Sequence, residues 1–421
     1  MSARHLPVRP DADQLRHQAE ELLEAIRAEN GPAIEDLRAF HPKKLKPADV
    51  SLADAQLVLA RSYQAPSWTR LMLACSLIDA IWEDDVDTVR ELVTAHPYLL
   101  NESATIRESN WGPPLTYAAN LGRDRIISLL HDMGAFDLDT ALDRATLQGK
   151  IGTARWLHKL LGSPRPPAGC LGGPAYTLNE DGTRLMFELG ARVYGHKGEQ
   201  LAPADVVLET DSRKPEAKHA ILEMYVRHGF ALPDSPTMAL HRGRIDLLEA
   251  HLRRDPRLLE RRFSHEEIYP PELGCHDEIL ATHGTPLAGT TLLHMCADFD
   301  ELEIARWLLE KGMDVNARAE VDKEGFGGHT ALFATVVSQP NFWMNHQHRP
   351  QVAPFTELLL DRGAQVNIRA SLRKQLHPGY DEFTMHEYRD VTPLSWGQRF
   401  HRKVFVSEPA MRLIVEHGGR P

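Results

Sequence analysis

The stretch TTLLHMCADFDELEIARWLLEKGMDVNAR, residues 290–318, decides the fold, because it reads as two short helices joined by a break. Leu293, Cys296 and Ala297 recur at the spacing of one helix face. After the break at residues 298–300, a second helix carries a wide apolar stripe. That stripe comprises Ile304, Ala305, Trp307, Leu308 and Leu309. Gly312 follows the last turn, where glycine adopts a left-handed conformation at least cost. The stretch therefore predicts a pair of short antiparallel helices.

A glycine at the end of an apolar helical stretch recurs along the chain. Glycines that close apolar helical stretches stand at Gly134, Gly162, Gly190, Gly229, Gly312, Gly363 and Gly418. Paired short helices that repeat with a period of about 33 residues are typical of a solenoid, in which each unit buries its apolar face against its neighbours. We therefore expect an all-α chain of stacked helix pairs.

This pattern resembles the ankyrin repeat, whose units open with Gly-x-Thr-Pro-Leu-His-x-Ala. Residues 289–297 fit that opening with leucine in place of proline, and residues 328–332 fit its front half. Residues 390–394 and 112–119 fit it in part, and the exits EKGMDVNAR and DRGAQVNIR match the end of the second helix. The resemblance covers roughly residues 75–421 and is weakest between 165 and 265. It implies an ankyrin-like helix-pair solenoid in which His294 is structural, bonding backbone and threonine groups.

Residues 1–72 have a different character. An amphipathic helix marked by Leu15, Leu22 and Ile26 ends before Gly31-Pro32, and Ser51 and Ser67 have the features of helix N-caps. This segment is similar to the helical leader of bacterial ankyrin-repeat proteins. We interpret it as a cap over the end of the solenoid, with a dimerising or peptide-binding bundle as the alternative. The expected organisation is a cap in residues 1–72, degenerate repeats in 73–263, and repeats with long inserted fingers in 264–421.

The bulk composition narrows the class of protein. The formal net charge is −11, which disfavours nucleic acid as a partner. No run of about 20 apolar residues is present, so we expect no membrane span. Four cysteines without CxxC spacing favour a reducing, cytoplasmic location and disfavour a thiolate metal site. Phosphate-binding, dinucleotide-binding and nucleophile motifs are also missing, so we expect no cofactor and no metal.

Three long insertions near the end of the sequence are the candidate site. They span residues 264–289, 317–329 and 369–390, and each follows a second helix and precedes a first helix. Insertions at equivalent points of a solenoid project from one edge, so these three fingers should lie side by side. The candidate binding residues are His265, Glu266, His276, Asp277, Phe326, His329, Arg373, His377, Tyr380, Asp381, His386 and Glu387.

Two functional classes follow from the fingers. The first is recognition of a protein or peptide across the concave face and the fingers, and it is the one we favour. The second is an enzyme or small-molecule binder, possibly of a sugar, with a pocket between the fingers and acid–base carboxylates such as Asp381 or Glu387. The string His386-Glu387-x-x-Asp390 is one residue from the HExxH zinc helix. However, Pro393 fits poorly in a continuing helix, so a zinc hydrolase is disfavoured.

Overall fold

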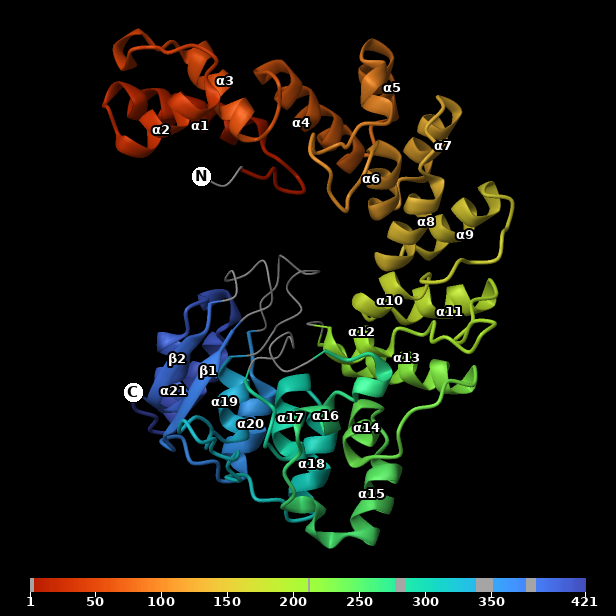
Figure 1. Ribbon diagram of the computed structural model, residues 1–421, viewed down its shortest axis with the longest axis vertical. Helices are drawn as coiled ribbons and strands as arrows, with labels where there is room; N and C mark the ends of the chain where they lie inside the picture. The colour runs from red at the N-terminus through yellow and green to blue at the C-terminus, as the bar shows by residue number, and fades with distance from the viewer. Residues whose placement is uncertain (1–3, 211–212, 277–284, 338–350, 376–383) are drawn as a thin grey trace. The chain divides into compact units, whose positions relative to one another are not determined.

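The computed structural model describes residues 4–210, 213–276, 285–337, 351–375 and 384–421 (Figure 1). The chain forms two compact units, residues 1–165 and residues 166–421. The expected division at residues 72 and 263 rests on sequence character and stays a prediction.

The first unit consists of helices linked by short turns. Its helices are α1 (Ala12–Arg27), α2 (Gly31–Phe40), α3 (Leu52–Ser62), α4 (Trp68–Trp82), α5 (Val86–Ala95), α6 (Pro114–Leu121), α7 (Asp124–Asp132), α8 (Leu138–Leu147) and α9 (Ile151–Leu160). The predicted N-caps are confirmed. The Ser51 hydroxyl accepts from the backbone N–H of Asp54 in a capping box, and Ser67 accepts from the N–H of Arg70. Because these side chains satisfy helix-end N–H groups, they fix where α3 and α4 begin.

The second unit contains helix pairs and one antiparallel hairpin. Its helices are α10 (Gly172–Tyr176), α11 (Glu180–Glu188), α12 (Ala204–Glu209), α13 (Pro215–Arg227), α14 (Pro236–His241), α15 (Ile245–Arg254), α16 (His265–Ile268), α17 (Leu292–Phe299), α18 (Leu302–Glu310), α19 (Ala331–Val336), α20 (Pro354–Asp361), α21 (Pro393–Arg399) and α22 (Glu408–Glu416). The strands β1 (Ala370–Lys374) and β2 (His386–Val391) pair with Leu372 opposite Tyr388 and Arg373 opposite Glu387.

Successive helix pairs stack in register. The first helices α17, α19 and α21 pack on one another in that order, and the second helices α18, α20 and α22 form a parallel row. In the first unit α4, α6 and α8 pack in the same way. The all-α, ankyrin-like solenoid predicted from the sequence is therefore confirmed, with β1 and β2 as a local addition inside the third finger. No helix in the described part of the chain is long and apolar enough to cross a membrane.

The geometry of the opening stretch rests on His294. Its Nδ1 lies 2.9 Å from the Thr291 hydroxyl, and its Nε2 lies 3.1 Å from the carbonyl oxygen of His329 in the next repeat. The ring is 1% exposed. His294 therefore links two repeats through backbone and threonine groups, as the sequence predicted.

Candidate functional site

The three fingers lie side by side and bond to one another through their backbones. The N–H of Glu320 in the second finger donates to the carbonyl of Gly289 in the first (2.9 Å). The N–H of Gly327 donates to the carbonyl of Ser371 in the third finger (2.6 Å). Gly327 has φ +120°, and a Cβ there would lie 1.9 Å from the carbonyl oxygen of Glu320. Glycine is therefore required where the second finger folds back on itself.

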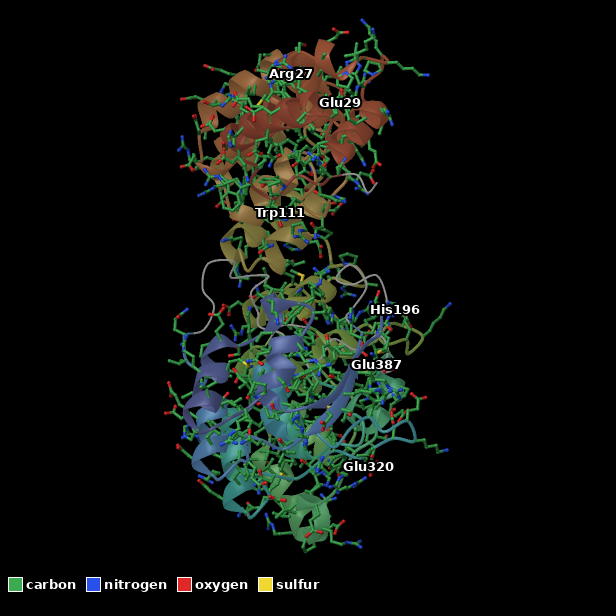
Figure 2. The ribbon with its side chains drawn as sticks, turned by 90° about the vertical axis from the view of Figure 1, so that its left-hand side faces the viewer. Arg27, Glu29, Trp111, His196, Glu320 and Glu387 are labelled. Carbon is green, nitrogen blue, oxygen red and sulfur yellow. The ribbon has the colours of Figure 1, made fainter. Side chains whose placement is uncertain are left out.

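A cleft of about 590 Å³ lies between the fingers. Its lining comes from all three of them: Pro286, Ala288, Gly289, Glu320, Val321, Asp322, Phe326, Gly327, His329, Ser371, Leu372, Arg373, Lys374, Gln375, Met385 and Glu387. We call this the finger cleft. Figure 2 labels Glu320 and Glu387, which come from the second and third fingers. A site of this size accommodates several side chains of a bound segment or a small ligand.

The wall of the finger cleft combines exposed apolar side chains with charge. Val321 is 60% exposed and Met385 is 46% exposed, unusual values for large apolar residues. The exposed Glu320 carboxylate has no ion-pair partner in the described part of the chain. Arg373, by contrast, is already paired, with its Nη2 2.6 Å from Asp322 and its Nη1 on Glu324. The cleft therefore offers apolar contact beside an unneutralised negative charge.

Phe326 holds the second and third fingers together. The ring is 4% exposed, and the guanidinium carbons of Arg373 and Arg389 lie 5.0 and 4.2 Å from its centroid. Cations at these distances over an aromatic face are attracted by its quadrupole. The predicted site residues Phe326 and Arg373 thus do come together at the cleft, where they stiffen its wall.

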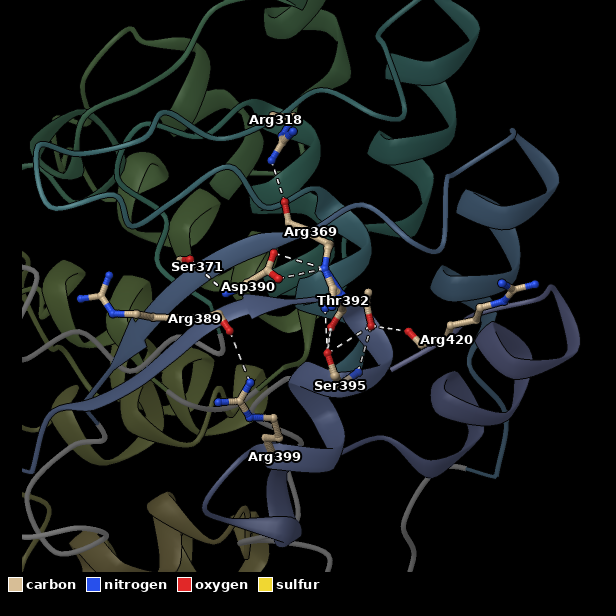
Figure 3. Close-up of polar contacts among 9 residues, drawn as sticks. All are labelled: Arg318, Arg369, Ser371, Arg389, Asp390, Thr392, Ser395, Arg399 and Arg420. Carbon is tan, nitrogen blue, oxygen red and sulfur yellow. Dashed lines mark hydrogen bonds and ion pairs between the residues drawn. The ribbon is translucent and has the colours of Figure 1, made fainter.

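A chain of arginine contacts fixes the base of the third finger (Figure 3). The guanidinium of Arg318 donates to the carbonyl of Arg369 (2.7 Å), and Arg369 Nε lies 3.2 Å from both oxygens of Asp390. The N–H of Asp390 in turn donates to the Ser371 hydroxyl (3.1 Å). The segment that follows the second helix of one repeat, residues 315–318, is therefore hydrogen-bonded to the equivalent segment of the next repeat, residues 366–369. This contact orients the β1–β2 hairpin over the cleft.

The imidazoles of His294 and of the predicted site residue His329 are buried. His329 is 1% exposed, and its Nε2 lies 3.0 Å from the carbonyl of Pro286. Burial lowers the pKa of His294 to about 4 and that of His329 to about 3, so both rings are neutral near pH 7. His329 lines the floor of the cleft, but its ring serves as a link between fingers.

The predicted residues of the first finger lie away from the finger cleft. His265 is buried, with Nε2 2.9 Å from the carbonyl of His276. His276 Nδ1 lies 2.7 Å from Oε2 of Glu209, the last residue of α12, so this finger contacts α12. Glu266 is exposed and lines a separate cleft near α15. The candidates Asp277, His377, Tyr380 and Asp381 lie outside the described residues.

The string that resembles a zinc helix forms a strand instead. His386 to Asp390 belong to β2, where side chains four residues apart do not meet as they do one helical turn apart. The His386 ring stacks on His401 with centroids 3.6 Å apart. Within the described residues, no three His, Cys, Asp or Glu side chains form a group that could hold a metal ion.

Comparison with known proteins agrees with the repeat geometry. The family model described as "Ankyrin repeat" matches residues 288–320, which contain α17, α18 and the start of the second finger. Over these residues the chain is similar to the ankyrin repeat. A search of curated protein sequences finds no match. Among solved structures, the ankyrin-repeat domain of human ASB11 is similar at 14% identity and a TM-score of 0.26, covering 73% of this chain and 99% of that one.

The structure adds site residues that sequence reasoning missed. Glu320, Val321, Lys374 and Met385 line the finger cleft but were not among the predicted binding residues. The available signal was Val321, an aliphatic residue set between the charged residues Glu320 and Asp322. Met385 had no comparable signal, because its position depends on the pairing of β1 with β2.

Proposed function

We propose that this protein binds an extended segment of a partner protein in the finger cleft. Ankyrin repeats typically bind proteins. The fingers lie beside α17, α19 and α21, the first helices of three successive repeats, which pack on one another. The observation that carries the proposal is the exposure of Val321 and Met385 on opposite fingers of one cleft. Apolar side chains held in water at a rigid cleft gain free energy when a partner covers them.

The charge at the cleft specifies the partner further. Glu320 carries an unpaired carboxylate next to Val321, whereas Arg373 is neutralised by Asp322 and Glu324. A segment with a basic residue flanked by apolar ones complements this wall, and electrostatic complementarity of this kind favours specificity and fast association. Participation of the concave face, also predicted from the sequence, belongs to the same proposal.

The enzymatic alternative gains no support at the cleft. Of the carboxylates named for acid–base chemistry, Glu387 lines the cleft and Asp381 lies outside the described residues. Glu387 is exposed, and its carboxylate is already paired with Arg389 at 3.1 Å. We therefore put protein recognition first.

Site-specific photo-crosslinking in the native host tests the proposal. A photo-reactive residue would replace Val321, Met385 or, as the control, Val352, which is 71% exposed on the same unit but does not line the cleft. The proposal expects one protein to be captured from positions 321 and 385 and not from 352. Equal capture at all three positions, or capture from 352 alone, would refute it. With the captured protein in hand, Val321→Ser should weaken binding by about five-fold, because about 1 kcal/mol of apolar contact is lost.

A further inference from the structure

The first unit carries an aromatic platform that is built independently of the finger cleft. Trp82 and Trp111 stack with centroids 6.4 Å apart, and Trp111 lies 4.8 Å from the ring of Tyr117. Trp82 Nε1 donates to the Tyr117 hydroxyl (3.0 Å), and Arg123 donates to the Trp82 carbonyl. Tyr117 is fully buried, whereas Trp82 and Trp111 are part-exposed (Trp111 is labelled in Figure 2). These contacts hold the rings in place from beneath.

Residues 4–10 of the same unit have no regular secondary structure, bend at Val8 and Arg9 and contact this platform, and we call them the strap. The Tyr117 hydroxyl donates to the carbonyl of Val8. Leu6 packs on the apolar cluster that contains Leu15 and Leu71, and Pro10 is buried at the point where the strap leads into α1. The strap thus contacts the platform through the main-chain carbonyl of Val8 and the side chain of Arg9.

Arg9 provides the charged contact of the strap. Its guanidinium carbon lies 5.4 Å from the Trp82 ring centroid, its Nε lies 3.0 Å from Asp79, and its Nη2 lies 2.5 Å from Glu83. An aromatic face beside two carboxylates one turn apart on α4 is a specific receptor for a guanidinium group. Pro7 and Pro10 favour the extended backbone around it, as in proline-rich ligands that bind aromatic grooves.

The strap is held mostly by contacts at the surface. The Arg9 side chain is 46% exposed, as is Asp79, and exposed ion pairs of this kind contribute little to stability. Nearer the N-terminus, the Arg4 guanidinium lies 2.9 Å from Asp36, the Arg4 N–H donates to the carbonyl of Ser62 (2.9 Å), and Arg107 contacts the His5 ring. A segment held in this way opens at a lower free-energy cost than a packed helix, and opening exposes the platform with its two carboxylates.

We propose that the platform of Trp82, Trp111 and Tyr117 with Asp79 and Glu83 is a peptide-binding site that the strap occupies in cis. The partner it fits is an extended, proline-containing segment with an apolar residue directly before an arginine, the pattern of Val8-Arg9-Pro10. Such a segment competes with the strap, so the strap acts as an intramolecular inhibitor of this second site. The site lies in the first unit and is separate from the finger cleft of the second.

Fluorescence anisotropy with the full chain tests this proposal. The probe is a labelled peptide with the sequence of residues 4–11, Arg-His-Leu-Pro-Val-Arg-Pro-Asp. Arg9→Ala removes the contacts of the strap with Trp82, Asp79 and Glu83, so the strap competes less well and we expect the probe to bind about five-fold tighter than to the wild type. Arg16→Ala, an exposed arginine on α1 away from the platform, is the matched control and should behave like the wild type.

Two further variants make the result decisive. Arg9→Ala combined with Asp79→Asn and Glu83→Gln should lose the gain, and a probe with alanine at its second arginine should not bind Arg9→Ala. Equal, weak binding of the probe to the wild type and Arg9→Ala would overturn the proposal, as would a gain that survives loss of both carboxylates. Mass photometry tests whether two copies of the chain exchange their straps. A wild-type dimer that Arg9→Ala abolishes would show that the platform binds the strap of a second copy, and would overturn the partner proposed here.

Discussion

The signature repeats around residues 288–337 and the degenerate repeats of residues 166–263 are tied to other parts of the solenoid by different chemistry. In the signature repeats, neutral imidazoles bridge to carbonyls, His294 to His329 and His329 to Pro286. The degenerate repeats lack the signature and are tied to α17 and α18 by buried ion pairs. Arg213 Nη2 lies 3.2 Å from Asp298, and Lys218 Nζ lies 3.1 Å from Glu301. The same helix-pair architecture therefore satisfies its buried polar groups in two ways, by imidazole–carbonyl hydrogen bonds and by ion pairs.

The two solutions respond differently to change. A buried ion pair is costly to break, because the remaining charge has no water to solvate it. Lys218 and Glu301 side chains are 5% and 2% exposed, and burial lowers the pKa of Lys218. A neutral imidazole link is weaker but is titrated by acid. The predictions below exploit this difference.

The largest effect is expected for Glu301→Ala. The substitution leaves Lys218 buried without its carboxylate, and breaking such a pair costs about 3–5 kcal/mol of unfolding free energy. Urea denaturation with hydrogen exchange read out over residues 213–310 measures it. Glu249→Ala removes an exposed carboxylate, 45% exposed, with ion pairs at 3.6 and 3.9 Å, and serves as the control with little expected change.

A companion variant separates charge burial from packing. In Lys218→Met/Glu301→Leu both charges are replaced by apolar groups, and we expect most of the lost stability to return, because buried pairs are often replaceable by apolar contacts. If the double variant is as unstable as Glu301→Ala, the ion pair is not what binds the degenerate repeats to α17 and α18.

An intermediate effect is expected from acid on the signature repeats. The folded pKa of His294, about 4, lies below its ordinary value of 6.5, so the unfolded chain binds the extra proton first. Its contribution is fully present above pH 6.5 and is lost as pH falls toward 4, by up to about 3 kcal/mol. Protonation would place an N–H at Nδ1 against the Thr291 N–H and hydroxyl.

The pH dependence is measured as the urea midpoint of residues 288–337 between pH 7.5 and 4.5. A His294→Asn/His329→Asn variant retains polar side chains that do not titrate, so its profile should be flatter over this range. The carboxylates titrate in both proteins, and their contribution cancels in the comparison. Parallel profiles for the two proteins would show that the imidazoles do not carry the acid sensitivity.

The smallest effect is expected for Arg318→Ala. Arg318 donates to the carbonyls of Gly328 (2.8 Å) and Arg369 (2.7 Å), and it is part-exposed, so we expect a loss of about 1 kcal/mol. Because these bonds orient the second and third fingers, amide exchange should accelerate in residues 317–329 and 384–391. Arg253→Ala, with a side chain 73% exposed on α15, should leave those amides unchanged. If amide exchange in these residues is unchanged in Arg318→Ala, the arginine contacts do not orient the fingers.

The sequence revealed the signature repeats more fully than the rest, for a physical reason. His294 bonds to a threonine three residues away and to a carbonyl in the next repeat, so its environment recurs with the period and is visible as a motif. The ion pairs Arg213–Asp298 and Lys218–Glu301 join residues that are 85 and 83 positions apart. No local sequence pattern marks such pairs. In the degenerate repeats the sequence therefore shows only the glycines that end apolar helical stretches.

The side-by-side arrangement of the fingers could be predicted from the sequence, because insertions at equivalent points of stacked repeats project together. That they form a binding site stays a prediction. Which side chains face the cleft depends on the hairpin register, in which Arg373 lies opposite Glu387, and on the turn at Gly327. Composition favoured the polar and aromatic residues of the fingers, whereas the exposed apolar contacts are Val321 and Met385.

Hydrogen exchange on the full chain, with and without the protein captured by crosslinking, tests the central claim most directly. The account predicts that the partner slows exchange of backbone amides in residues 320–329 and 384–389, the walls of the finger cleft, and leaves the degenerate repeats of residues 166–263 unchanged. Slowed exchange confined to the degenerate repeats, with the fingers unaffected, would contradict it.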